Sequence, residues 1–156
     1  MIQMKKAKKD AMMLSGMMTR TNNQREFEGN GNIQKLWEQF YAQDTNENQR
    51  NQSQPIYAIY SDYESEEFGH YNYTISTECS RFPLTNFTMH IPKQNYIVFT
   101  TEKGPIAEVV PNAWEEIWNW SKTSAEKRSF TYDMEVYDER AQDPANAIVD
   151  IYIAIV

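Results

Sequence analysis

A glutamate flanked by tyrosines near the end of the chain is the group best suited to chemistry. It lies in FTYDMEVYDE, residues 130–139. Side chains alternate between the two faces of a strand, so an extended segment puts Glu135 and Tyr137 on one face, with Thr131 and Asp133. The opposite face is predicted to be ordinary core: Phe130, Tyr132, Met134 and Val136. A carboxylate among phenols can bind a cation or act as an acid–base group.

The last segment, residues 147–156, repeats this two-sided pattern. One row is strictly apolar and suits a helix-covered face: Val149, Ile151, Ile153 and Ile155. The other row is mixed and contains Asp150 and Tyr152. Because acid and phenol recur on two neighbouring strands, the pattern predicts a ligand groove on the mixed face, with Tyr152 and Glu135 on the same side.

Composition limits the classes of function. The chain has 156 residues, a formal net charge of -7, and 13% aromatic residues, including 10 Tyr and 4 Trp. We expect one domain over residues 1–156, with rings that line a cavity as well as a core. A net negative charge argues against direct nucleic-acid binding, and no apolar run approaches the ~20 residues that span a membrane. The single cysteine, Cys79, allows no internal disulfide and fits a cytoplasmic location.

The chain contains two similar halves, approximately residues 11–78 and 87–156. Each half is predicted to run strand, helix, strand, strand. Apolar residues at helical spacing mark the two helices, with Trp37 in the first and Trp114, Ile117 and Trp118 in the second. The predicted strands cover residues 11–21, 56–63, 71–77, 95–104, 130–139 and 147–156, and residues 87–92 are either an edge strand or a linker.

Neither half can bury itself, so the predicted fold is α+β: duplicated strand-helix-strand-strand units forming one antiparallel sheet with two helices on one face. Gly16 is expected to mark a bulge in the first strand. The lysines of residues 5–9 are interpreted as a solvated, edge-protecting lead-in to that strand. In the third segment, Tyr60 is placed on the face of Ala58, and Tyr63 on the opposite one.

Four segments together resemble the GyrI-like small-molecule-binding domains, the effector-binding modules of multidrug-sensing transcription regulators, which also occur alone as integron-cassette proteins. They are IPKQNYIVFTTEKG (residues 91–104), AWEEIW (113–118), RSFTYDMEVYDE (128–139) and VDIYIAIV (149–156). The resemblance covers the chain from about Met12 to Val156. Gln94 and Asn95 depart from it, since a glycine often precedes the tyrosine there.

The resemblance implies an aromatic pocket between the halves, in which an acid meets cationic, amphipathic ligands. Matched by motif, Glu135 is that acid and Tyr137 stands beside it. Trp114 and Trp118 match aromatic positions on the second helix. Tyr60 and Tyr73 are candidates because their half mirrors the other.

Binding is the favoured class, and two others stay open. In the family that this chain resembles, some members hydrolyse small electrophilic compounds, and the resemblance would make Glu135 and the tyrosines the acid–base groups. A protein–protein module is the third class. His70 and His90 lack metal-ligand spacing, so no metal or cofactor is expected. No segment resembles a helix-turn-helix, so regulation would need a separate DNA-binding partner. Monomer and homodimer remain equally compatible with the sequence.

Overall fold

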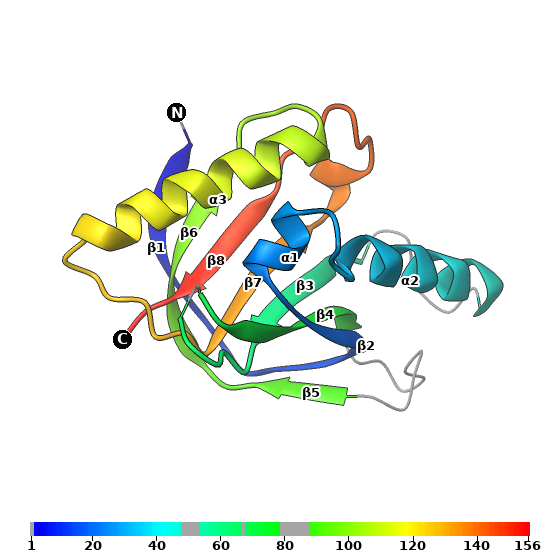
Figure 1. Cartoon of the computed structure of the whole chain (residues 1–156), viewed down its shortest axis with the longest axis horizontal. Coiled ribbons are helices and arrows are strands. Elements are labelled where there is room, and N and C mark those ends of the chain that lie inside the picture. Colours follow the sequence, from blue (N-terminus) through cyan, green and yellow to red (C-terminus); the bar gives the residue numbers. More distant parts are fainter. Residues whose placement is uncertain (1, 48–53, 67, 79–87) are drawn as a thin grey trace.

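The computed structural model describes residues 2–47, 54–66, 68–78 and 88–156 (Figure 1). The elements are, in chain order, β1 (Gln3–Lys9), β2 (Met12–Asn22), α1 (Asn23–Phe27), α2 (Ile33–Glu47), β3 (Ile56–Ser61), β4 (His70–Glu78), β5 (Thr88–Ile91), β6 (Gln94–Thr100), α3 (Ile106–Thr123), β7 (Tyr132–Tyr137), a 3₁₀ turn (Glu139–Ala141) and β8 (Asp150–Ala154).

All eight strands form one sheet in the order β1-β6-β8-β7-β3-β4-β2-β5, and every neighbouring pair is antiparallel. The two predicted units are β2-α2-β3-β4 and β6-α3-β7-β8, and they meet where β3 pairs with β7. The strand before each unit crosses over: β1 pairs with β6, and β5 pairs with β2. The predicted fold class is confirmed, and residues 88–91 are an edge strand.

Both long helices lie on the same face of the sheet. The buried side chains under α3 include Val149, Ile151 and Ile153, which pack with Ile117 as their strictly apolar row predicts. Under α2, Leu36 and Phe40 pack instead on β3 and β4 in a separate cluster. Each helix therefore covers its own half of the sheet, and the junction of β3 with β7 lies between them (Figure 1).

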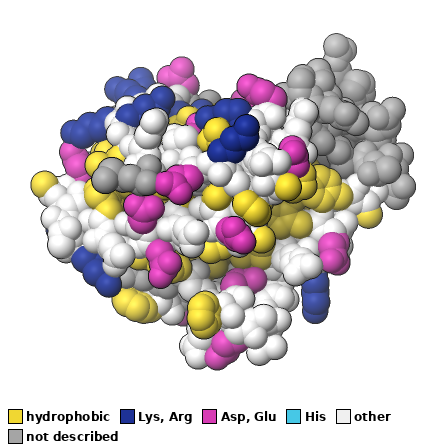
Figure 2. All heavy atoms as spheres, turned by 90° about the horizontal axis from the view of Figure 1, so that it is seen from above, with side chains coloured by type: hydrophobic (Ala, Val, Ile, Leu, Met, Phe, Trp, Pro, Cys, Tyr) yellow, Lys and Arg dark blue, Asp and Glu magenta, His cyan; other side chains and the backbone are white. Residues whose placement is uncertain are grey.

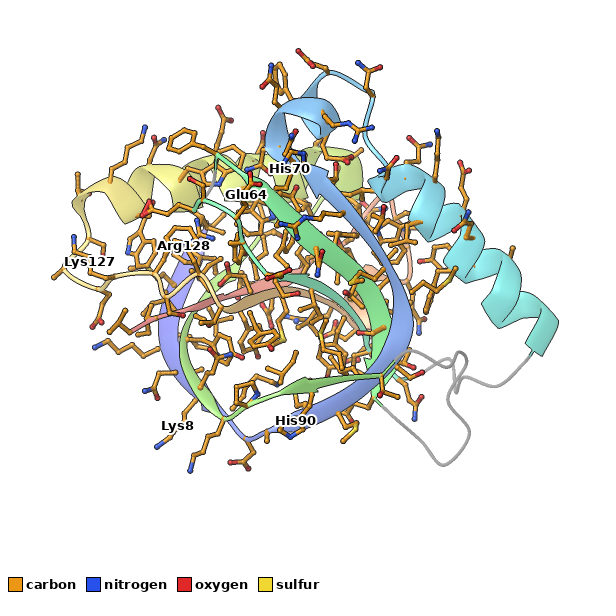
Figure 3. All side chains as sticks on the ribbon, turned by 60° about the horizontal axis from the view of Figure 1, so that its bottom comes forward. Lys8, Glu64, His70, His90, Lys127 and Arg128 are labelled. Carbon is orange, nitrogen blue, oxygen red and sulfur yellow. The ribbon has the colours of Figure 1, made fainter. Side chains whose placement is uncertain are left out.

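The other face of the sheet also encloses a core. The strands curve round an interior filled with side chains (Figure 3), among them Leu14, Tyr96 and Met134. Tyr132, Met134 and Val136 belong to this cluster, as the alternation in β7 predicts. The ligand groove predicted beside Tyr152 thus falls on a face where the described side chains form a core.

Three sequence interpretations need correction. The lysine-rich lead-in is itself a strand, β1, and its position at the end of the sheet agrees with an edge-protecting role. Gly16 marks no bulge, because the β2–β4 register runs unbroken through Gly16 and Ser76. A Cβ on Gly16 would lie 2.0 Å from the carbonyl oxygen of Ile75, so close backbone approach explains the glycine. The short helix α1 was not predicted.

Cys79 and most of the polar stretch at 46–55 lie outside the described residues. Among the helices that are described, none combines the length and apolar character needed to cross a membrane.

Candidate functional site

A cavity of about 330 Å³ opens on the helix side of the sheet, above the junction of the two units. Its floor is sheet, one wall is α3, and its rim comes from α1 and the start of α2. The lining residues are Asn23, Glu26, Phe27, Ile33, Tyr60, Tyr63, Tyr71, Val110, Pro111, Trp114, Trp118, Arg128 and Glu135. α3 packs mainly on the second half of the sheet and α2 on the first, and the cavity lies over the seam between them.

Glu135 lies in the floor of this cavity and is 2% exposed. Trp114 Nε1 and the hydroxyl of Tyr60 both donate to its Oε2, each at 2.7 Å. The hydroxyl of Tyr137 donates to Oε1 at 2.6 Å. The donors come from three different elements, α3, β3 and β7, so the fold as a whole positions this carboxylate.

Burial and hydrogen bonding act on Glu135 in opposite directions. Removal from water raises the pKa of the Glu135 carboxyl, and the donors Tyr137, Tyr60 and Trp114 partly offset this by stabilising the ionised form. Burial, together with the nearby carboxylate, raises the pKa of Tyr60 and Tyr137 well above the ordinary phenol value, so both act as neutral donors. Among the described residues, no lysine, arginine or histidine forms a salt bridge with Glu135.

Aromatic rings surround the carboxylate. The ring of Tyr60 lies 5.0 Å from that of Trp114, 5.1 Å from Tyr73 and 5.3 Å from Tyr71, measured between centroids. Trp118 follows Trp114 along α3 at 6.2 Å, so both tryptophans line the cavity. These contacts surround the Glu135 carboxylate with an apolar wall of rings.

The candidate residues fall into three groups. Glu135, Tyr60, Trp114 and Trp118 line the cavity. Tyr137 and Tyr73 lie behind it: Tyr137 donates to Glu135, and the hydroxyl of Tyr73 accepts from Trp37 Nε1 at 2.9 Å. Tyr152 does not belong to the site.

The placement of Tyr152 beside Glu135 is wrong because the register pairs Tyr152 with Met134, and Glu135 with Ile151. Tyr152 therefore projects from the other face of the sheet, where its ring lies 5.6 Å from that of Tyr96. Lys9 Nζ lies 4.9 Å from the centroid of the Tyr152 ring on that side. The acid-bearing face of β7 is the helix-covered face, shared with the apolar row of β8.

Local backbone conformation moves two further residues. Asp62 has φ 50°, which breaks the alternation after β3, and Tyr63 turns back to the cavity side, where its hydroxyl donates to Asp133. Phe130 has φ 52° and lies ahead of β7, half-buried, so it does not share the core face of Met134. Both corrections concern strand ends, where the alternation rule stops applying.

Sequence reasoning missed several lining residues. Tyr71 lies two positions before Tyr73 on β4 and so on the same face, and alternation could have added it to Tyr73, which was selected because the halves mirror each other. Arg128, in the connection from α3 to β7, gave no local signal. The rim helix α1 gave no local signal either, and its lining residue Phe27 is 94% exposed.

The rim helix is fixed by local hydrogen bonds. Asn22 caps α1 by accepting from Arg25 N, and Glu26 Oε2 accepts from Asn32 N at 2.8 Å, which ties α1 to the start of α2. From above, apolar side chains gather in a band near the middle of the surface, with acidic side chains scattered around it and basic ones mainly along one edge (Figure 2). A ligand approaching this surface thus meets both apolar area and negative charge.

Comparison with known proteins bears on the family and the fold of this chain. Residues 7–155 match the profile of a protein family described as integron-associated effector binding protein. YobU of Bacillus subtilis (strain 168), whose name describes it as a candidate transcriptional regulator, is 37% identical in an alignment 153 residues long, which covers 94% of this chain and 93% of YobU.

Two solved structures share the fold. An integron cassette protein from the mobile metagenome of Vibrio cholerae matches with a TM-score of 0.84 and 26% identity, covering 99% of this chain and 97% of that one. SAV2435, solved with bound tetraphenylphosphonium, matches with a TM-score of 0.78 and 16% identity, covering 99% and 94%. At that identity, the second match bears on the fold alone.

Proposed function

The chain belongs to the family of integron-associated effector-binding proteins, and we propose that its cavity binds amphipathic organic cations, with Glu135 as the charge partner and the rings as the apolar contact. A family of effector-binding proteins suggests a small-molecule ligand. The finer proposal, a cationic ligand in this cavity, rests on the geometry of the site. The domain is proposed to act as a single binding unit over residues 1–156.

The observation that carries the proposal is a buried carboxylate with donors but no cation. Glu135 is 2% exposed, and within the described residues it has three neutral donors and no salt bridge. An acid removed from water is costly unless it is paired. An entering cation would supply the missing charge, and each ring face it meets would add about 0.5–2 kcal/mol.

The rings make the site tolerant of ligand shape. Apolar burial is non-directional, so Tyr60, Tyr71, Trp114 and Trp118 can contact many hydrophobic surfaces. A positive charge near Glu135 then distinguishes a ligand from a neutral compound of the same size. Tetraphenylphosphonium is a suitable probe because it combines a delocalised cation with four rings, and it is the ligand bound in the SAV2435 structure.

The test is Glu135→Gln, which removes the charge and keeps the shape. A glutamine carbonyl can still accept from Tyr60 and Trp114, and its amide can donate to the hydroxyl of Tyr137. We expect at least a tenfold loss in affinity for tetraphenylphosphonium by calorimetry, which equals about 1.4 kcal/mol. Binding of tetraphenylmethane, the neutral compound with the same four rings, should change less than threefold.

Glu116→Gln is the matched control, because Glu116 is exposed on α3 and does not line the cavity. It makes the same change in net charge and should leave affinity within twofold. Equal losses for charged and neutral probes with Glu135→Gln would contradict charge pairing. Normal binding by this variant, combined with loss of a hydrolytic activity on ester substrates, would favour the enzyme class instead.

A further inference from the structure

Arg128 lines the cavity together with the acids Glu135 and Glu26, and contacts within the protein satisfy only part of its guanidinium group. Arg128 lies in the connection from α3 to β7, and its side chain is 3% exposed. Figure 3 shows Arg128 nearer to the sheet than its neighbour Lys127, which is exposed. The Arg128 guanidinium carbon lies 4.1 Å from the centroid of the Phe130 ring and 6.0 Å from that of Trp114.

Asp133 explains only one nitrogen of the guanidinium. Arg128 Nη2 donates to Asp133 Oδ2 at 2.8 Å, and the same carboxylate accepts from Tyr63 and, at Oδ1, from Ala154 N at 2.8 Å. Arg128 Nε and Nη1 are buried and have no hydrogen-bond partner among the described residues. Buried donors without an acceptor are uncommon and unfavourable, so the fold alone does not account for an arginine here.

Trp114 lies between Glu135 and Arg128. Its Nε1 donates to Glu135, and the Arg128 guanidinium lies over its ring. The cavity therefore has a carboxylate in its floor and, in its wall, an arginine with two buried donors that lack a partner among the described residues. A ligand that satisfies both groups needs a positive centre and, elsewhere on the same molecule, a hydrogen-bond acceptor.

We propose that Arg128 is a specificity-determining residue that donates from Nε or Nη1 to a carbonyl or other acceptor on the ligand, so that the preferred ligands are amphipathic cations bearing an acceptor group. This inference rests on the proposed function, because it concerns ligands of the same cavity. The competing explanation is that Arg128 only neutralises Asp133.

Arg128→Lys separates the two explanations. A lysine keeps the positive charge and can pair with Asp133, but it has a single ammonium group and no donors equivalent to Nε and Nη1. Circular dichroism and thermal unfolding of this variant report whether the ion pair and fold survive. The ligand preference then reports whether the lost donors served the ligand.

The probes are triphenylphosphonium cations with a flexible arm of three to six carbons. In one series the arm ends in a methyl ketone, and in the other the ketone oxygen is replaced by a methylene group, which keeps the shape and removes the acceptor. Varying the arm length covers the unknown separation of the two groups. Affinities are measured by calorimetry for the wild-type chain and for Arg128→Lys.

We expect the wild-type chain to bind the ketone about tenfold more tightly than its alkene at one or more arm lengths. In Arg128→Lys the ratio should fall to near one, while affinity for the alkene changes less than threefold. Equal affinities in the wild type at every length, or an unchanged preference in the variant, would overturn the inference.

Two further readouts complete the test. If Arg128→Lys does not fold, the guanidinium Nε–H resonance of the wild type decides: it should shift with the ketone and not with the alkene, and identical shifts contradict the inference. If the alkene probes bind and depend on Glu135 but no ketone preference exists, only the inference fails. If no cation binds the wild type, the proposed function fails and the inference with it.

Discussion

Tyr137→Phe should weaken cation binding from behind the cavity, by changing when Glu135 ionises. Tyr137 does not line the cavity, and its hydroxyl is the donor to Glu135 Oε1. The other two donors, Tyr60 and Trp114, both reach Oε2. Phenylalanine removes one oxygen and leaves the ring, which lies 5.2 Å from that of Trp37.

The size of the effect follows from one hydrogen bond to a charged group. Such a bond contributes about 1.5–3 kcal/mol, and it stabilises the carboxylate more than the neutral acid. Burial already raises the pKa of Glu135, and loss of this hydrogen bond raises it further. A cation pairs with the ionised form of Glu135. At a pH below the pKa of Glu135 in both the wild type and the variant, Tyr137→Phe should therefore bind the cation about 10- to 150-fold more weakly, because about 1.4 kcal/mol corresponds to a factor of ten.

The sign of the pH dependence is fixed by the direction of the shift. Because burial raises the pKa of Glu135, affinity for tetraphenylphosphonium should rise with pH as the carboxyl loses its proton. The curve for Tyr137→Phe should have the same shape, displaced to higher pH, and should rejoin the wild-type curve once Glu135 is ionised in both. Calorimetric titrations at half-unit steps from pH 5 to pH 9 measure both curves.

Tyr152→Phe is the control, since it removes a phenol oxygen from the opposite face of the neighbouring strand. It should leave the curve unchanged. A Tyr137→Phe loss that is the same at every pH would refute the reasoning, because the hydroxyl would then act on the ligand or on cavity shape. Superimposed curves would refute it too, because the hydrogen bond would then have no influence on ionisation.

Two predictions concern stability. Ile151→Asp should abolish cooperative thermal unfolding, because it buries an unpaired charge directly across from Glu135. The control Ile151→Val should lower the free energy of unfolding by only about 0.5–1.5 kcal/mol. An Asp variant that folds would show that water reaches the space beneath α3. Gly16→Ala should lower the free energy of unfolding by about 1–3 kcal/mol in urea titrations, because the new Cβ meets the Ile75 carbonyl. An unchanged unfolding midpoint would mean that β2 and β4 can move apart at no cost in free energy.

Periodicity predicted most of the fold because the repeated units have strong local patterns. The stripes with Trp37 and with Trp114 identify the helices, and the row containing Ile151 identifies a strand under a helix. The crossed edge strands could not be predicted in the same way. β1 is rich in lysine and β5 is only four residues long, so neither has the apolar alternation of a central strand.

The site was only partly predictable because its side chains meet through long-range contacts. Alternation correctly grouped Glu135 with Tyr137, but acids on a strand usually indicate a solvated face, and here the acid lies beneath a helix. Three hydrogen-bond donors make that burial tolerable, and two of them, Tyr60 and Trp114, are not evident from the residues around Glu135. Arg128 was missed for the same reason, since its partner Asp133 becomes recognisable only when the α3–β7 connection is folded.

The duplication explains why one carboxylate can receive phenols from both halves. Tyr60 follows Ala58 by two residues, just as Tyr137 follows Glu135, and the register pairs Ala58 directly with Glu135. A pseudo-two-fold axis between these two residues would exchange them, and with them the two tyrosines. Because the first unit has alanine at this place, the single carboxylate has room at the axis, and both hydroxyls converge on it.

Two carboxylates at the axis would repel each other, and one would remain protonated in the absence of a cation. Loss of symmetry at this one pair of positions therefore gives a site with one negative charge in a nearly symmetric ring of phenols. Trp114 and Arg128 come only from the second unit, so they add direction to a centre that the repeat alone would leave symmetric. On this argument, the duplicated fold provides the aromatic enclosure, and the differences between its halves determine which ligand fits.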